Sequence, residues 1–204
     1  QVITEQSVDN ALRVLLAIGG STNAIIHLTA IAGRLGIRVS LERLNLLSDD
    51  TPVIVNLKPT GSHYMQDFFA AGGVAAVLDE LKNKLYLDCL TVTGETLGER
   101  IERQRGQPVD RSVIARYDDP IEPVGGLVAL FGSLAPRGAV LKRSAADMRL
   151  FEKEGSAVVF SSLEDLAQRV DDPALAVTAD SFLVLQNAGP TSATAMPEAG
   201  YLPI

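Results

Sequence analysis

Residues 19–23 carry the densest set of groups in this sequence that could bind a small molecule. They read Gly-Gly-Ser-Thr-Asn, and His27 follows one helical turn after Asn23. Two glycines let a backbone approach a ligand closely, and the N–H groups at the start of a following helix favour an anion. Ser21, Thr22 and Asn23 would add neutral donors and acceptors for a carboxylate or for hydroxyl groups.

A plainer interpretation of the same stretch is favoured by spacing alone. Ser21 or Thr22 would then serve only as the N-cap of a helix that follows a helix–helix turn. His27 would be an ordinary core histidine rather than a catalytic base, because the sequence offers it no visible partner. Only further motifs in the chain can change this balance.

Three other positions have side chains suited to chemistry. His63 lies in the stretch PTGSHYM, which we interpret as a polar turn after a strand in preference to a ligand site. Cys89 is the only cysteine, so an internal disulfide is excluded and a reducing compartment is indicated. A lone buried thiol is favoured over a metal ligand as the role of Cys89, because no second cysteine lies at a ligand spacing. Glu198 follows a loop of small residues, where a carboxylate either suits a hard cation such as Mg²⁺ or is simply solvated.

The segments on either side of the glycine pair are predicted to be helices. In residues 8–18, four apolar side chains fall on one helical face, namely Val8, Leu12, Leu15 and Leu16. Glycine loses the most entropy when it is ordered in a helix, so the pair ends this one. Residues 23–36 are apolar almost all round, which predicts a second helix that is buried.

The next segments combine helices with one buried strand. Ser40 can cap the helix that follows it, and residues 52–57, PVIVNL, read as a buried strand. A second glycine pair, at 72–73, separates the segment YMQDFFAA from a helix over residues 74–84. Helices around a buried strand predict an α/β domain.

After about residue 88 the sequence changes to short β-branched or apolar runs separated by Gly, Pro and Asp, a spacing that predicts a β-rich unit. Residues 162–170 are an exception, since they form an amphipathic pattern capped by Ser162 with acidic residues in the first turn. The polar, proline-containing stretch at 101–121 reads as a linker.

The composition limits the class of protein. The chain has 204 residues, 47% hydrophobic and 21% charged, which is enough for a substantial core. A net charge of −7 and the lack of a Lys/Arg run argue against a nucleic-acid partner. No apolar run approaches the roughly 18 to 20 residues of a membrane-spanning helix, so we expect a cytoplasmic protein without a membrane partner.

Several motifs, taken in order, resemble one enzyme family. The segment AIGGSTNAIIHLTAIAGRLGI is similar to a signature segment of the dihydroxy-acid dehydratase and phosphogluconate dehydratase family. Further blocks follow in family order: PVIVNLKPTGSHYMQDFFAAGGVAAVLDEL, LTVTGETLGE, PIEPVGGLVALFGSLAPRGAVLKRSAA, GSAVVFSSLEDLAQRVDDPALAVTADSFLVLQNAGP and MPEAG. The resemblance covers nearly the whole chain, and LVLQNAGP followed by MPEAG looks most like the sugar-acid (aldonate) branch.

The resemblance implies a hydro-lyase that removes water from a 2,3-dihydroxy acid and leaves a 2-keto acid. Its substrate would be a sugar acid such as an aldonate, or the dihydroxy acid of branched-chain amino-acid synthesis. Family members use an iron–sulfur cluster as a Lewis acid on the departing 3-hydroxyl and Mg²⁺ on the carboxylate and 2-hydroxyl. A serine alkoxide takes the proton from C2. The resemblance also implies a homo-oligomer.

Carried over residue by residue, the resemblance places few of these groups in this chain. The family's cluster cysteines lie upstream of the Gly-Gly-Ser-Thr-Asn block, Cys89 is not at a cluster position, and the serine base falls beyond Ile204. No catalytic residue is therefore expected here. Glu198, in the Met-Pro-Glu motif, is the one metal ligand that maps onto the chain, and residues 21–23 are expected to line the substrate pocket.

We therefore expect part of a dehydratase that is inactive in isolation. Residues 1–100 would be the end of the N-terminal α/β domain, 101–121 the linker, and 122–204 the first part of a β-rich, barrel-like C-terminal domain. The alternative is a divergent, non-catalytic ligand-binding or assembly module with the dehydratase fold. It is motivated by the missing cysteines and by TSATAM, where the family has glycines whose wider backbone freedom shapes the loop near Glu198.

Overall fold

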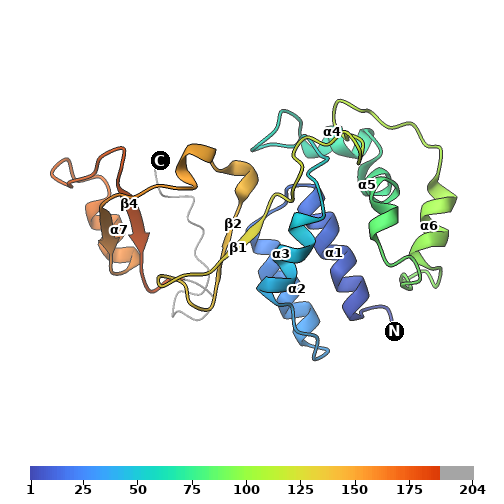
Figure 1. Ribbon diagram of the computed structural model, residues 1–204, viewed down its shortest axis with the longest axis horizontal. Helices are drawn as coiled ribbons and strands as arrows, with labels where there is room; N and C mark the ends of the chain where they lie inside the picture. Colours follow the sequence, from blue (N-terminus) through green and yellow to red (C-terminus); the bar gives the residue numbers. More distant parts are fainter. Residues whose placement is uncertain (189–204) are drawn as a thin grey trace. The chain divides into compact units, whose positions relative to one another are not determined.

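The computed structural model describes residues 1–188 (Figure 1). The chain divides into two compact units, the first spanning Gln1–Ala146 and the second beginning at Asp147.

The first unit begins with helix α1, Glu5–Ala17. Its N-terminus is closed by a reciprocal pair of hydrogen bonds, in which the Ser7 amide donates to Thr4 Oγ1 and the Thr4 amide donates to Ser7 Oγ. The four apolar residues expected on one face are all buried, and Leu12 and Leu16 are almost completely inaccessible. The periodicity of the sequence is thus confirmed.

Helix α1 ends at the predicted glycine pair. Gly19 has φ = +60°, a left-handed conformation that side chains other than glycine rarely adopt, so the chain can reverse there. Helix α2, Thr22–Gly33, starts at once, with Ser21 as its N-cap. The Ser21 hydroxyl accepts a hydrogen bond from the Asn23 amide at 3.2 Å, which confirms the predicted cap.

The prediction that this second helix is buried is wrong for this chain. Only Ile25 and Ala32 are buried, whereas Ile31 is 50% exposed and His27 is also exposed. The reason is that α2 packs against α1 along one face, where Ile25 and Ala32 join the core of that region. The apolar residues on its other faces have no neighbour among the described residues that removes them from water.

The chain then forms α3, Leu41–Asp49, which begins at the predicted cap Ser40. Residues 53–55, in the predicted strand, are extended and buried, but they form isolated bridges instead of a continuous strand. Val53 pairs with Glu122 and Val55 pairs with Ile114. Each partner segment touches the extended stretch at a single position, so no sheet forms around it.

Three helices and one 3₁₀ turn complete the helical part of the first unit: α4 at Met65–Ala70, α5 at Gly73–Leu81, η1 at Lys82–Lys84 and α6 at Leu97–Gln104. A helix was expected at α5, whereas α4 and α6 were not predicted. Helix α6 is closed by a capping box, in which Glu99 accepts from the Thr96 amide at 2.7 Å and Thr96 Oγ1 accepts from the Glu99 amide at 3.2 Å. The Thr-x-x-Glu spacing is the sequence signal for this helix.

Two clusters of buried side chains form the core of this unit. One gathers α1, α2, α3 and Leu127, and the other gathers α4, α5, the extended stretch, Ile101, Val113 and Ile114. The last three residues lie within 101–121, so this stretch contributes to the packing. The domain boundaries expected at residues 100 and 121 stay a prediction.

Short strands follow, as the second half of the sequence predicts. In the first unit β1, Val128–Leu130, pairs antiparallel with β2, Ala139–Leu141, and the 3₁₀ turn η2, Arg143–Ala145, comes next. The bonded register places Ala129 opposite Val140. Ala129 is buried beside α3, which anchors the hairpin to the helices.

The second unit contains a strand–helix–strand arrangement. After the 3₁₀ turn η3, Met148–Leu150, come β3 at Ala157–Phe160, α7 at Leu163–Arg169 and β4 at Phe182–Leu185. The two strands pair in parallel. Phe160 is fully buried, Leu166 is buried as well, and Ser162 caps α7 as predicted.

The mixture of helices and small sheets is consistent with the expected α/β class. Within residues 1–188 each sheet has two strands, and neither closes on itself. The barrel-like part of the expectation is therefore not observed in the described part of the chain. A search of the same residues finds no helix long and apolar enough to cross a membrane.

Candidate functional site

The predicted pocket residues gather at the start of α2. Ser21 is exposed, and Thr22 and Asn23 are half-buried in the first turn of the helix. Ser21 Oγ accepts from the Asn23 amide, which leaves its hydroxyl proton available to a ligand. Among the described residues, the Thr22 and Asn23 side chains have no hydrogen-bond partner, so three neutral polar groups are available side by side.

The turn that precedes these residues packs against another glycine pair, Gly125 and Gly126. The Gly126 amide donates to the Leu16 carbonyl at 3.2 Å, at the end of α1. A Cβ placed on Gly126 would lie 2.9 Å from Gly19 Cα and 3.1 Å from Ser144 Oγ. Three segments that are distant in the sequence therefore meet at van der Waals contact, and glycine is required at the point where they cross.

The convergence of these three segments was not expected from the sequence. Its only sequence signals are the glycine pair in PVGGL and the polar residues of LKRSAA, both of which lie in the family blocks. Neither motif shows by itself that it contacts the Gly-Gly-Ser-Thr-Asn turn, because more than a hundred residues separate them along the chain.

The other singled-out residues lie elsewhere on the first unit. His63 lies in the predicted polar turn, and its Nδ1 is 4.0 Å from Asp67 Oδ2. Cys89 is half-buried rather than fully buried, at the edge of an apolar hollow of about 320 Å³ that Val14, Leu78 and Leu97 help to line. Neither residue contacts the start of α2, and His27 points away from the core as an exposed residue.

Glu198, the predicted metal ligand, lies outside the described residues. The structure therefore says nothing of its distance from the start of α2. Its proposed role stays a prediction from the sequence.

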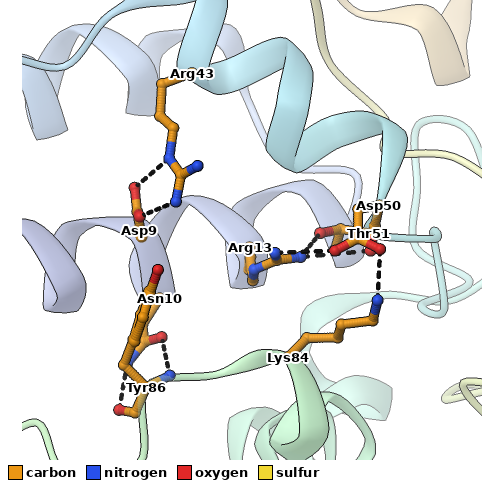
Figure 2. Close-up of polar contacts among 8 residues, drawn as sticks. All are labelled: Asp9, Asn10, Arg13, Arg43, Asp50, Thr51, Lys84 and Tyr86. Carbon is orange, nitrogen blue, oxygen red and sulfur yellow. Dashed lines mark hydrogen bonds and ion pairs between the residues drawn. The ribbon is translucent and has the colours of Figure 1, made fainter.

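A network of charged residues holds helix α1, whose C-terminal end leads into this site (Figure 2). Arg13 and Lys84 both point toward Asp50, with nitrogen–oxygen distances of 3.0 Å and 2.5 Å. The Lys84 ammonium, followed by the Arg13 guanidinium, lowers the pKa of the Asp50 carboxyl, because a nearby positive charge and its hydrogen bonds favour the ionised form. This network joins α1 to the ends of α3 and η1.

Two further contacts fix the N-terminal half of α1. Arg43 of α3 donates to Asp9 through Nε and Nη2, at 3.3 Å and 2.5 Å. The Asn10 side chain donates to the Tyr86 carbonyl at 3.0 Å and accepts from the Tyr86 amide at 2.9 Å (Figure 2). Helix α1 is thus held by polar contacts at several points along its length, which limits how far the glycine turn at its end can move.

Two family models match the chain, one after the other. A family model for the N-terminal part of dihydroxy-acid/6-phosphogluconate dehydratases matches residues 1–100. The model for the C-terminal part of the same family matches residues 112–204. The chain belongs to this dehydratase family. The resemblance carried by the Gly-Gly-Ser-Thr-Asn block and its neighbours is therefore confirmed.

Individual relatives of the chain belong to the same family. The chain is 42% identical to a 6-deoxy-6-sulfo-D-gluconate dehydratase of Pseudomonas putida, over 99% of this chain and 35% of that protein. It is also 42% identical to an L-arabinonate dehydratase of Rhizobium leguminosarum bv. trifolii, with the same coverage. A dihydroxy-acid dehydratase of Caldicellulosiruptor saccharolyticus is 44% identical over 83% of this chain and 31% of that protein. The chain thus spans about a third of the length of these curated relatives.

The side chains of the described residues do not fit the metal groups that the resemblance implies. Within residues 1–188, no three His, Cys, Asp or Glu side chains lie close enough to hold a metal ion together. Cys89, half-buried beside an apolar hollow, offers one sulfur atom, whereas an iron–sulfur cluster is held by several cysteine sulfurs.

Proposed function

We propose that this dehydratase chain is part of a hydro-lyase that converts a 2,3-dihydroxy acid into a 2-keto acid. The observation that carries the proposal is the match to both parts of one dehydratase family, in their order, along almost the whole chain. In the reaction, a proton leaves C2 and hydroxide leaves C3. The resulting enol then tautomerises to the 2-keto acid.

We favour a sugar acid, such as an aldonate, as the substrate. Two of the relatives that match 99% of this chain are named for sugar acids, a sulfonated gluconate and an arabinonate. The branched-chain dihydroxy acid is the second candidate, because two dihydroxy-acid dehydratases match about 83% of the chain at similar identity and another matches 97% of it at 37% identity. Both substrates share the 2,3-dihydroxy carboxylate on which the reaction depends.

In this proposal, residues 21–23 form one wall of the substrate pocket. Ser21, Thr22 and Asn23 present neutral hydrogen-bonding groups at the N-terminus of α2, where the helix dipole and free backbone N–H groups favour a carboxylate. Their contribution would be binding and orientation, through hydrogen bonds from neutral side chains. The plainer role as a cap is compatible with this one, because capping uses only one lone pair of Ser21.

The remaining parts of the proposal concern the whole enzyme. The iron–sulfur cluster and Mg²⁺ would be held by residues outside the described part, with Glu198 as one magnesium ligand. The strands after residue 122 would belong to a β-rich, barrel-like domain. The enzyme would be a cytoplasmic homo-oligomer, and the 204 residues alone are expected to be inactive.

The experiment that tests the function is an assay of the full-length dehydratase with a panel of aldonates and with dihydroxyisovalerate, measuring 2-keto acid. Turnover of at least one of them is expected, whereas the isolated chain should produce none. A full-length protein inert toward the entire panel would refute the hydro-lyase and favour a non-catalytic binding module.

A second experiment tests the pocket wall. Replacing Ser21, Thr22 and Asn23 together by alanine in the full-length enzyme should raise KM, because the substrate loses hydrogen-bond partners. Wild-type kinetics in a correctly folded triple variant would remove these residues from the site.

A further inference from the structure

The Arg143 guanidinium lies where the glycine turn, the end of α3 and the Gly125–Gly126 pair come together. Its Nε and Nη2 donate to the Gly125 carbonyl at 3.1 Å and 2.9 Å, so both nitrogens bind one oxygen. The same Nη2 donates to Ser48 Oγ at 3.0 Å. One side chain thus ties the chain before β1 to the last turn of α3.

Ser48 connects Arg143 to the buried core of the unit. It is completely buried, and its hydroxyl donates to the Leu127 carbonyl at 2.6 Å. Its own carbonyl accepts from the Gly125 amide at 2.8 Å. The Gly125–Leu127 segment is therefore held on both sides, by Ser48 from the helix and by Arg143 from the turn that follows β2.

Close packing also ties the Gly125–Leu127 segment to the turn at the end of α1. A Cβ on Gly125 would lie 2.6 Å from Ser48 Oγ and 3.0 Å from Leu16 Cδ2, so the segment fits in one place only. Gly126 contacts Gly19 and donates to Leu16, as described above. Ser144 adds a hydrogen bond from its amide to the Gly126 carbonyl at 3.2 Å. Moving Gly125 would therefore move the turn that aims residues 21–23.

We propose that Arg143 is a positioning residue of the dehydratase, which holds the Gly19–Gly20 turn, and through it the start of α2, in the orientation that the substrate needs. The proposal rests on the proposed function, because it assumes that residues 21–23 face the substrate. Arg143 acts through Gly125 and Ser48 and does not itself touch the substrate. The planar guanidinium is suited to this role, since it can reach two acceptors at once in a fixed geometry, which an ammonium group cannot reproduce.

The first test uses the 204-residue chain and does not depend on activity. Amide hydrogen exchange is measured for Gly20, which donates to the Leu15 carbonyl at 3.0 Å, and for Gly126. In Arg143→Ala both amides should exchange about tenfold faster, the effect of losing charge-assisted hydrogen bonds, with Arg143→Lys in between. The α5 amides, in the same unit, should not change. Arg149→Ala is the matched control, because Arg149 is 88% exposed and pairs with Asp147 in the second unit.

The second test uses the full-length enzyme. Arg143→Ala should lower kcat/KM about tenfold or more, mainly through a higher KM, because it misplaces the binding groups whose removal is also expected to raise KM. Added guanidinium should restore part of the lost turnover in this variant and none in Arg143→Lys. Arg149→Ala should behave as the wild type.

Unchanged exchange at Gly20 and Gly126, or full turnover in Arg143→Ala, would overturn the proposal. So would faster exchange throughout residues 1–146 in both the alanine and the lysine variants, since Arg143 would then be a general structural residue. A wild-type enzyme without any dehydratase activity would overturn the proposed function instead. The exchange experiment would still decide whether Arg143 holds the turn.

Discussion

Asn10 allows the polar attachment of α1 to be tested quantitatively. Its side chain is 6% exposed and makes two hydrogen bonds to the backbone of Tyr86, one as donor and one as acceptor. It therefore imitates a peptide group and joins α1 to the segment after η1. Asn10→Ala removes both bonds and leaves the Tyr86 backbone without these partners.

The expected loss of stability follows from these contacts. Two hydrogen bonds between neutral groups contribute about 1 kcal/mol each, so Asn10→Ala should lower the free energy of unfolding by about 2 kcal/mol. Larger losses are not expected, because Tyr86 is partly exposed and water can replace part of the lost bonding. Asn10→Asp should cost at least as much at neutral pH, since a carboxylate in place of the amide would face the Tyr86 carbonyl without a proton to donate.

Urea unfolding of the 204-residue chain, followed by far-ultraviolet circular dichroism, measures this difference. Helices α1 to α6 all lie in the first unit, so the signal reports mainly on the part that contains Asn10. Gln6→Ala is the matched control, because Gln6 is an exposed amide side chain on the same helix and should change stability by less than about 0.5 kcal/mol. If Asn10→Ala were as stable as Gln6→Ala, the two hydrogen bonds would contribute nothing net and the reasoning would be refuted.

Three further predictions concern the ion pairs, the glycine crossing and the metal ligand. Asp50→Asn should destabilise the chain at pH 7 by up to about 1 kcal/mol, a small effect because the Asp50 side chain is 47% exposed. Lys84 and Arg13 lower the pKa of Asp50 in the folded state, so the stabilisation by Asp50 is present above its unfolded-state pKa and is lost as the pH falls through its folded-state pKa. The urea midpoints of the wild type and Asp50→Asn should therefore converge in acid. A difference between the two midpoints that does not change with pH would contradict this. Gly126→Ala should lower the free energy of unfolding by about 1 to 3 kcal/mol, because the new Cβ would be 2.9 Å from Gly19 Cα. Gly33→Ala is the control and should not destabilise the chain, because the space around Gly33 is open. Equal urea midpoints for the two variants would argue against the close contact between Gly126 and Gly19. Glu198→Gln in the full-length enzyme should weaken Mg²⁺ binding in a titration, because a neutral amide is a poorer ligand for a hard cation, and unchanged affinity and turnover would exclude Glu198 from the site.

The local rules of the sequence determined much of the helical part of this protein. The apolar spacing in residues 8–18 predicted the buried face of α1, and Ser21, Ser40 and Ser162 were each expected to cap the helix that they do cap. These features depend on neighbours within about one helical turn, which the sequence displays directly. Helix α6 was missed although its Thr96–Glu99 capping box was visible, because the polar stretch after it suggested a linker.

The sequence also determined the family, through blocks that lie in order along the chain. It did not determine which apolar residues become buried. An apolar pattern predicted a buried α2, but burial requires a partner for every face, and within the described residues α2 has one on the α1 side. In the same way, residues 52–57 had the composition of a strand, but a strand also needs a continuous partner, and only isolated bridges form.

Only the tertiary structure decided what holds the candidate site. Gly19, Gly126 and Arg143 are far apart in the sequence, and nothing in their local patterns links them. The contact of Gly126 with Gly19, and the hydrogen bonds from Arg143 to Gly125, depend on where α1 ends, where α3 ends and how the chain returns through β2, which are non-local properties of the fold. The sequence therefore identified the residues that face a ligand in our proposal, and the structure identified the residues that hold them in position.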